Sequence, residues 1–144
     1  MVGFIFDWRI QAVFTKMTLQ EKADRIFSTF IRVSYADFQG YVHCFTCEEC
    51  LHWKQAQCGH WLRRWFGATR YHEDNCRPQC QECNEFRGGM EEAFEEALRS
   101  DIGDERVDAL IALSKKHDQY TDDDYREIIK TYGLILKEKY HILI

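Results

Sequence analysis

Two Cys-x-x-Cys pairs set the strongest limit on how this chain can fold. They are Cys44 with Cys47 and Cys80 with Cys83, and residues 48–79 lie between them. Four thiolates hold zinc in a closed tetrahedral site, and such a site helps to fold a segment that has few apolar residues of its own. We therefore expect these four cysteines to hold a structural Zn²⁺ at the centre of the chain.

The other three cysteines leave one alternative open. Cys47 and Cys50 also form a Cys-x-x-Cys pair, so Cys50 is an alternative to Cys44 as a zinc ligand. Cys58 and Cys76 are then left over, and their expected role is packing as small buried side chains. Seven cysteines are an odd number, which favours metal binding over a disulfide framework where thiols stay reduced.

Composition predicts a folded intracellular protein. Of the 144 residues, 45% are hydrophobic and 15% are aromatic, which suits one domain with its own core. No apolar run reaches the length of a membrane span, and Asp7 and Arg9 interrupt the start too early for a signal peptide. We expect a cytoplasmic protein with no membrane partner.

Charge is distributed unevenly along the chain. Residues 1–50 carry 5 Lys/Arg against 6 Asp/Glu, residues 51–90 carry 6 against 4, and residues 91–144 carry 8 against 14. The net charge of −5 argues against a bulk nucleic-acid binder, but a small basic region can steer a phosphate to one place. An ordinary mixed surface is the alternative. The candidates for contact with a DNA backbone are Arg63, Arg64, Arg70, Arg77 and Arg87.

Helical patterns flank the cysteine-rich centre. Thr18 and Glu21 form a capping box in front of apolar residues at helical spacing, which predicts an amphipathic helix over residues 19–33. Gly88-Gly89 breaks the chain after the second cysteine pair. A further helix is expected at Met90–Arg99. Two more are expected to begin after a cap at Asp104 and at Thr121.

The centre itself has no helical stripe. Short strands are expected at Tyr41–Phe45 and around Gln57–Leu62, and a helix is expected to begin near Gln79–Cys80. The aromatic side chains of Trp61, Trp65 and Phe66 are expected in the core. The fold class is therefore α+β in a single domain over residues 1–144, comprising an N-terminal helical region (1–40), a zinc-stapled centre (41–90) and a helical extension (91–144).

His60 and Asn84 are the polar residues best placed for chemistry. Asn84 directly follows the last cysteine of the pairs, and His60 lies on the strand expected between them. Zinc would bring this strand and the following helix together, so the imidazole and the carboxamide can face one cleft. A neutral histidine can deprotonate water, and an asparagine oxygen suits a hard ion such as Mg²⁺. Both are needed for metal-assisted hydrolysis of a phosphodiester.

This order of residues resembles the HNH (ββα-metal, His-Me finger) nucleases: Cys-x-x-Cys, a histidine on the following strand, a mid-loop asparagine, then Cys-x-x-Cys-Asn. The match extends to the phage NinG (Rap) recombination-protein family over roughly residues 20–140, including the helical tail. The stretches that carry it are ADRIFSTFIR, CFTC, GHW, RYHEDNCRPQCQECNEFRGG and ALRSDIGDERVDAL.

The resemblance implies a zinc-stapled ββα-metal core with nuclease activity. A protein of this kind is a divalent-metal-dependent DNA endonuclease that acts on branched recombination intermediates such as Holliday junctions, in the bacterial host if it is phage-encoded. By position, His60 is the general base, Asn84 binds the catalytic Mg²⁺ or Mn²⁺, and Asn75 orients the loop of the base.

One residue departs from the nuclease pattern. Many HNH enzymes have an aspartate immediately before the base as a second metal ligand, but this chain has Gly59. The acidic residues nearest in the motif that can approach the ion instead are Glu73 and Asp74. The alternatives are a non-catalytic zinc module that binds DNA or protein, and an HNH nuclease of the packaging or homing type that cuts linear duplex.

Cutting a four-way junction symmetrically requires two active sites, so a homodimer is expected. The expected dimer surface is an apolar stripe on the last helix, and its alternative role is packing on the zinc-stapled centre. The stripe consists of Ile128, Ile129, Tyr132, Ile135 and Leu136.

Overall fold

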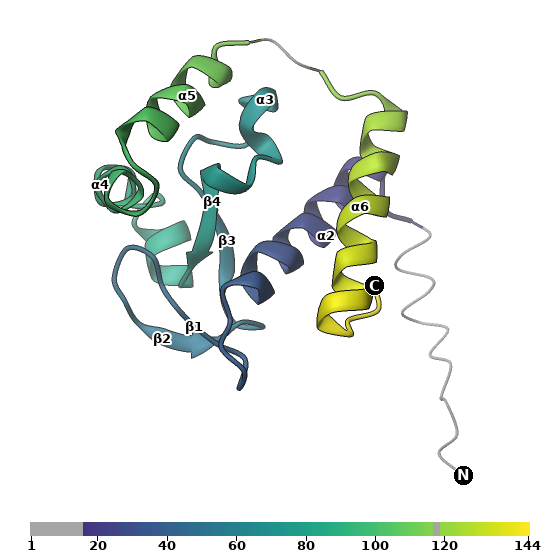
Figure 1. The fold of residues 1–144 in the computed structure, drawn as a ribbon, viewed down its shortest axis with the longest axis horizontal. Helices are drawn as coiled ribbons and strands as arrows, with labels where there is room; N and C mark the ends of the chain where they lie inside the picture. Colours follow the sequence, from purple (N-terminus) through teal and green to yellow (C-terminus); the bar gives the residue numbers. More distant parts are fainter. Residues whose placement is uncertain (1–15, 117–118) are drawn as a thin grey trace.

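Two small antiparallel hairpins lie between two groups of helices (Figure 1). The structure is a computed structural model, and it describes residues 16–116 and 119–144. Its elements, in chain order, are α2 (Leu19–Ser34), β1 (Tyr41–His43), β2 (Cys50–His52), β3 (Gln57–His60), α3 (Gly67–Arg70), η1 (Glu73–Asn75), β4 (Cys76–Gln79), η2 (Glu82–Phe86), α4 (Glu91–Ile102), α5 (Asp104–Ser114) and α6 (Asp122–Tyr140). The prediction of a mixed α+β fold is confirmed.

The two hairpins form separate sheets. β1 pairs with β2, and His43 faces Cys50 across that pair; β3 pairs with β4, and His60 faces Cys76. Phe45 just after β1 donates its N–H to the carbonyl of Pro78 in β4 at 2.9 Å, which ties the hairpins together. α3 and η1 lie between β3 and β4, and the helical turn η2 follows β4 after Cys80 and Gln81.

The predicted helix 19–33 is confirmed as α2, and α6 lies beside it (Figure 1). Both helices begin with a capping box, from Thr18 and from Thr121. The expected dimer stripe on α6 is largely used inside the chain: Leu136 is fully buried, and the ring of Tyr132 lies 5.0 Å from the ring of Phe27 on α2. Ile129, Tyr132 and Ile135 also pack against this core but stay partly exposed, so most of the stripe is used inside the chain and its role in a dimer stays a prediction.

A second core lies under α4 and α5. Trp61 is buried there, as expected, together with Phe94, Leu98, Val107 and Leu110. α5 begins at Asp104 itself and has no side-chain cap, so the predicted capping role of Asp104 is not observed. Trp65 is 71% exposed, so its predicted place in the core is wrong.

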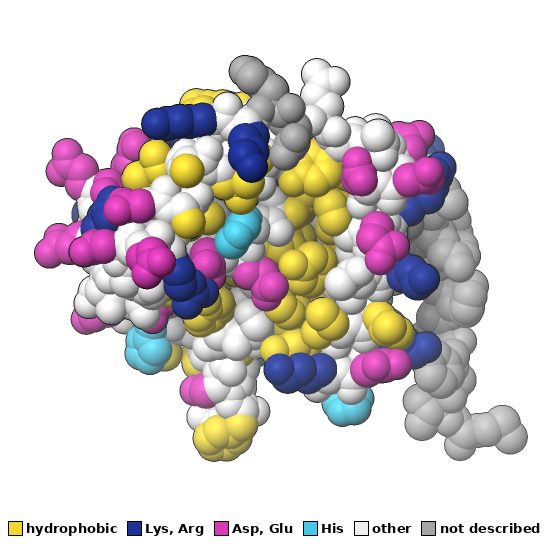
Figure 2. Space-filling view, turned by 45° about the horizontal axis from the view of Figure 1, so that its top comes forward, with side chains coloured by type: hydrophobic (Ala, Val, Ile, Leu, Met, Phe, Trp, Pro, Cys, Tyr) yellow, Lys and Arg dark blue, Asp and Glu magenta, His cyan; other side chains and the backbone are white. Residues whose placement is uncertain are grey.

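The surface shown in Figure 2 carries acidic side chains on both sides of a band of hydrophobic ones, and the basic side chains on it lie apart from one another. This face therefore offers no continuous basic surface to a nucleic acid. Across the described residues, every helix is too short or too polar to cross a membrane.

Candidate functional site

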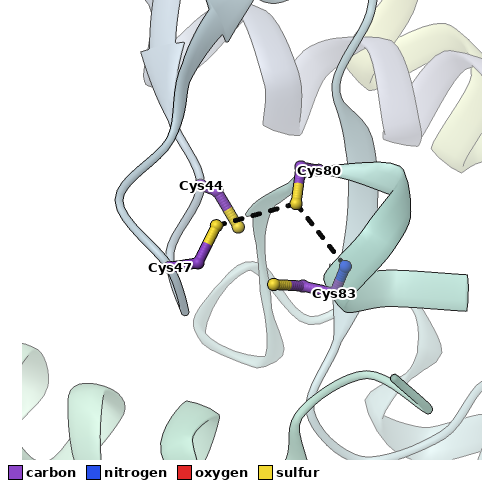
Figure 3. Close-up of side chains that lie close together, drawn as sticks. All are labelled: Cys44, Cys47, Cys80 and Cys83. Carbon is purple, nitrogen blue, oxygen red and sulfur yellow. Dashed lines mark hydrogen bonds between the residues drawn. The ribbon is translucent and has the colours of Figure 1, made fainter. Parts of the chain in front are cut away.

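Cys44, Cys47, Cys80 and Cys83 converge on one point, two from the loop after β1 and two from the start of the helical turn after β4 (Figure 3). Their sulfur atoms all lie within 4.8 Å of one another. The Sγ atoms of Cys47 and Cys80 are 3.7 Å apart, and Zn–S bonds of about 2.3 Å place the corners of a tetrahedron about 3.8 Å apart. This cluster can hold a metal ion such as zinc.

Main-chain turns set the direction of these thiols. The main-chain carbonyl of Cys44 accepts a hydrogen bond from the N–H of Glu48 at 2.8 Å in a tight turn. The N–H of Cys83 donates to Cys80 Sγ at 3.5 Å. Burial opposes ionisation of the Cys44 thiol, but backbone hydrogen bonds outweigh it and lower its pKa to about 6. Burial raises the pKa of the Cys80 and Cys83 thiols, so a cation is required to hold all four as thiolates.

Cys50 lies outside this cluster. It belongs to β2, is exposed, and faces His43 across the β1–β2 pair. The cluster is therefore made from Cys44 rather than from Cys50.

Both His60 and Asn84 line a cleft of about 830 Å³. His60 is the last residue of β3, and Asn84 lies on η2, whose Arg87 N–H bonds the carbonyl of Glu82 in a π-type turn. π-type turns within helices occur often at functional sites. His60 and Asn84, which the sequence singled out, thus lie on different elements but line the same cleft.

The ring of His60 is held by the main chain. Its Nε2 lies 2.9 Å from the carbonyl oxygen of Arg70, and since a carbonyl only accepts hydrogen bonds, Nε2 carries the proton of the neutral ring. Nδ1 then keeps its lone pair and can accept a proton. Burial of the ring lowers the pKa of His60 below its ordinary value, so the neutral form predominates at pH 7.

Asn75 ties the loop after β3 to β4. Its side chain is fully buried; Oδ1 accepts the Leu62 N–H at 2.8 Å, and Nδ2 donates to the carbonyls of Leu62 at 2.9 Å and Thr69 at 3.1 Å. The carbonyl of Arg70, which holds the ring of His60, follows Thr69 directly in the chain. Asn75 therefore fixes the segment that orients His60.

Replacing Asn75 with alanine removes the partner of three main-chain groups. Because a buried group left without a hydrogen bond costs about 1–3 kcal/mol, we expect the free energy of unfolding to fall by about 2–4 kcal/mol. Urea denaturation measures this change. Asn84→Ala is the matched control, because the Asn84 amide donates to the side chain of Gln57 rather than to the main chain. A loss below about 1 kcal/mol for Asn75→Ala would contradict its structural role.

Three of the five candidate arginines line the cleft. Arg63 and Arg64 are exposed, and the guanidinium of Arg63 lies 5.2 Å from the ring centre of Trp65. Arg70 also lines the cleft, but its Nε donates to Asp24 Oδ1 at 2.9 Å and its Nη2 to Asp24 Oδ2 at 2.5 Å. Arg64 Nη1 also lies 3.7 Å from Asp24 Oδ2, but its side chain is 58% exposed against 14% for Arg70. Arg63 and Arg64 are therefore better placed than Arg70 to contact a phosphate.

The other two arginines lie elsewhere. Arg77 is 2% exposed and forms an ion pair of 2.9 Å with Asp101, so a DNA contact from Arg77 is not supported, because its guanidinium is enclosed by the protein. Arg87 is exposed, with its Nε 3.4 Å from Glu82, and its contact with DNA stays a prediction.

Comparison with protein families decides the relationship. The family model for the bacteriophage lambda NinG protein matches residues 6–141. The chain belongs to the NinG family. Comparisons with curated proteins and with solved structures gave no match.

Cys58, His60 and Cys76 form a second cluster of side chains of the kinds that bind metals in this NinG family member. The sulfurs of Cys58 and Cys76 and a ring nitrogen of His60 lie within 4.8 Å of one another. Cys76 is fully buried against the apolar side chains of α2, and Cys58 packs against the same core. Three donors leave room for a water molecule as the fourth ligand of a tetrahedral ion. Both cysteines also pack on the core under α2, which fits the packing role expected from the sequence.

This assignment predicts one zinc per chain. Cys58→Ala is expected to leave the zinc content unchanged at one equivalent, because Cys58 is not part of the four-cysteine cluster. Elemental analysis of the dialysed protein measures this content. A wild-type content of two that falls to one in Cys58→Ala would show that this group holds a metal and that His60 is not free.

The acidic replacements considered for Gly59 lie away from the cleft. Asp74 forms an ion pair with Arg106 and lines a different cavity, together with α5. Sequence reasoning missed two cleft residues that contact the predicted ones: Asp24, which bonds Arg70 from α2, and Gln57, which bonds Asn84. Asp24 had no local signal, because it comes from a distant helix. Gln57 could have been found, since it lies two residues before Gly59 on the same face of β3.

Proposed function

We propose that this NinG family member is a divalent-metal-dependent DNA endonuclease with an HNH, or ββα-metal, core formed by β3, β4 and η2. One observation carries the proposal: His60, whose ring is held by main-chain contacts to Arg70 and Cys58 and whose pKa is lowered by burial, lines the same cleft as Asn84. A base for water and an oxygen ligand for a hard cation are the protein groups that metal-assisted phosphodiester hydrolysis needs.

The donors at this cleft fit a hard divalent ion. Asn84, Gln57 and Glu85 contribute carboxamide and carboxylate oxygens, and Mg²⁺ or Mn²⁺ favours such oxygen ligands with water in the remaining positions. Of these, Asn84 is the proposed ligand. When bound, the ion supplies positive charge that stabilises the negative charge developing on the phosphate.

The protein groups then act in one hydrolytic step. His60 Nδ1 takes a proton from a water molecule, whose oxygen forms a bond to phosphorus. The bond from phosphorus to one ester oxygen breaks, and that oxygen leaves with the electron pair and takes a proton from solvent. Arg63 and Arg64 hold the neighbouring phosphates, and Asn75 keeps the carbonyl that fixes the ring of His60 in place.

Branched DNA is the proposed substrate. Trp65 and Phe66 lie next to the exposed arginines of the cleft and remain accessible, with Trp65 71% exposed. An exposed aromatic ring beside a guanidinium is suited to stack on a base that has lost its neighbour, as occurs at a junction. Two sites per junction require two copies of the chain, so we propose a homodimer.

A panel of DNA substrates tests this function. The full-length, zinc-loaded protein is incubated with a synthetic four-way junction, a forked duplex and a linear duplex, each with Mg²⁺, Mn²⁺ or EDTA. The proposal expects cleavage of the junction that requires the divalent ion. Equal or faster cutting of the linear duplex would favour a packaging or homing type of nuclease. Binding without any cleavage would favour a non-catalytic zinc module.

Activity is expected to fall at acid pH. The protonated form of His60 cannot accept a proton, and burial holds its pKa below the ordinary 6.5. We therefore expect kcat/KM to rise with pH through that lowered pKa and to be level from about pH 7 upward. Initial rates between about pH 5 and pH 9 measure the profile. A rate that still rises tenfold per unit above pH 7 would contradict a neutral histidine base.

A further inference from the structure

Position 59 cannot carry the acidic ligand that the nuclease pattern places there. A Cβ atom on Gly59 would lie 2.1 Å from Oε1 of Gln79. Gln79 is fully buried, and its Nε2 donates to Thr46 Oγ1 at 2.9 Å and to the Gly89 carbonyl at 3.0 Å. Its oxygen end is thereby directed at Gly59 and finds no hydrogen-bond donor among the described residues. An aspartate at 59 would have to displace this anchored side chain.

Gln57 is the next residue on the same face of β3. Side chains alternate along a strand, so residues 57 and 59 project to the same side. The carboxamide of Gln57 is held at both ends: Nε2 donates to Glu85 Oε1 at 2.6 Å, and Oε1 accepts from Asn84 Nδ2 at 2.7 Å. Because an ionised carboxylate only accepts hydrogen bonds, the group of Gln57 that faces Glu85 must be its NH₂ group. The oxygen of Gln57 therefore faces Asn84.

Glu85 also supplies the charge that the two amides lack. Gln81 donates to its second oxygen at 3.1 Å, so both oxygens of Glu85 accept a hydrogen bond from a glutamine amide. Asp24, another carboxylate of the cleft, is already bound by Arg70 and by the Tyr71 hydroxyl at 2.8 Å. Glu85 is thus connected to the amide of Asn84 by two hydrogen bonds, with Gln57 between them.

We infer that Gln57 supplies the second side-chain oxygen of the divalent-ion site, beside Asn84, and that Glu85 orients it. The inference rests on the proposed function and replaces the absent ligand at position 59. In the ion-bound state Asn84 presents its oxygen to the ion, so the hydrogen bond from its Nδ2 to Gln57 is given up. Two neutral oxygens next to one carboxylate suit a hard cation that keeps most of its water.

Mn²⁺ binding tests the inference without depending on catalysis. Electron paramagnetic resonance of free Mn²⁺ gives the dissociation constant for the full-length, zinc-loaded wild type and for each variant. Gln57→Ala is expected to weaken Mn²⁺ binding at least about tenfold, with the zinc content and unfolding midpoint unchanged. Gln57→Glu keeps an oxygen and adds charge, so it is expected to bind at least as tightly as wild type.

Gln81→Ala is the matched control. Gln81 bonds the same carboxylate as Gln57 but does not line the cleft, so its loss is expected to change Mn²⁺ affinity less than twofold. Wild-type binding in Gln57→Ala, or equal weakening in both alanine variants, would overturn the assignment of Gln57 while leaving the nuclease proposal intact. A wild type that neither binds Mn²⁺ nor cuts DNA would overturn both.

Discussion

His60→Ala is expected to lower kcat/KM for junction cleavage by about 10²–10⁴-fold, the contribution of a positioned general base. The alanine variant retains the cleft but has no group to take the proton from the attacking water. Junction affinity, measured by fluorescence anisotropy in EDTA, is expected to stay within about twofold of wild type, because the proposed phosphate contacts come from Arg63 and Arg64 and not from His60. The loss therefore lies in turnover rather than in binding.

His43→Ala controls for the removal of an imidazole. His43 lies on β1, is exposed, and does not line the cleft, so its loss is expected to leave cleavage unchanged. If His60→Ala cut the junction as fast as wild type, the assignment of the base would be wrong. If both variants lost activity and zinc together, the effect would come from the fold and not from proton transfer.

Cys47→Ser is expected to release the zinc and to unfold the centre of the chain. Structural zinc contributes about 10–16 kcal/mol of apparent binding free energy in small zinc domains, and that energy is available only when the site folds. In this chain the cysteine cluster joins the loop after β1 to the helical turn after β4. Losing one thiolate is therefore expected to remove the bound zinc on dialysis and to lower the unfolding midpoint by more than about 10 °C.

Cys50→Ser is the matched variant. Cys50 is exposed like Cys47 and lies three residues away, but it belongs to β2 and not to the cluster. It is expected to keep one zinc per chain and the wild-type unfolding midpoint. Elemental analysis and thermal denaturation measure both quantities. The reverse result, zinc lost from Cys50→Ser and kept in Cys47→Ser, would place Cys50 in the site.

The sequence predicted the features that rest on local patterns. The capping box at Thr18 and the helix start at Thr121 marked the starts of α2 and α6 correctly, because each signal lies within a few neighbouring residues. β4 was not predicted, since the stretch CRPQ contains a proline and no apolar alternation. β4 is a strand because it pairs with β3, and this long-range pairing has no local sequence pattern.

Burial of charged residues could not be read from the sequence. Arg77 follows a cysteine in a basic region and was a reasonable candidate for DNA contact, yet its partner Asp101 comes from the end of α4. The stripe on α6 was correctly recognised as apolar, but only the position of α2 decides what covers it. Long-range packing determines both, and no motif records it.

The cleft combines both kinds of information. His60 and Asn84 were found from their order relative to the cysteine pairs, and the structure brings both to one cavity. The sequence could not show why position 59 is glycine: the side chain of Gln79, from the paired strand, fills the space beside it. Nor could it show that Gln57, two residues earlier on β3, is hydrogen-bonded to Asn84.

Cleavage of a synthetic four-way junction by the full-length protein, followed during titration with Mn²⁺, tests the central claim most directly. The account predicts no cutting in EDTA, and a cleavage rate that rises with Mn²⁺ until the ion site is saturated, in step with Mn²⁺ binding. A zinc-loaded, folded protein that leaves the junction intact at every Mn²⁺ or Mg²⁺ concentration would contradict it.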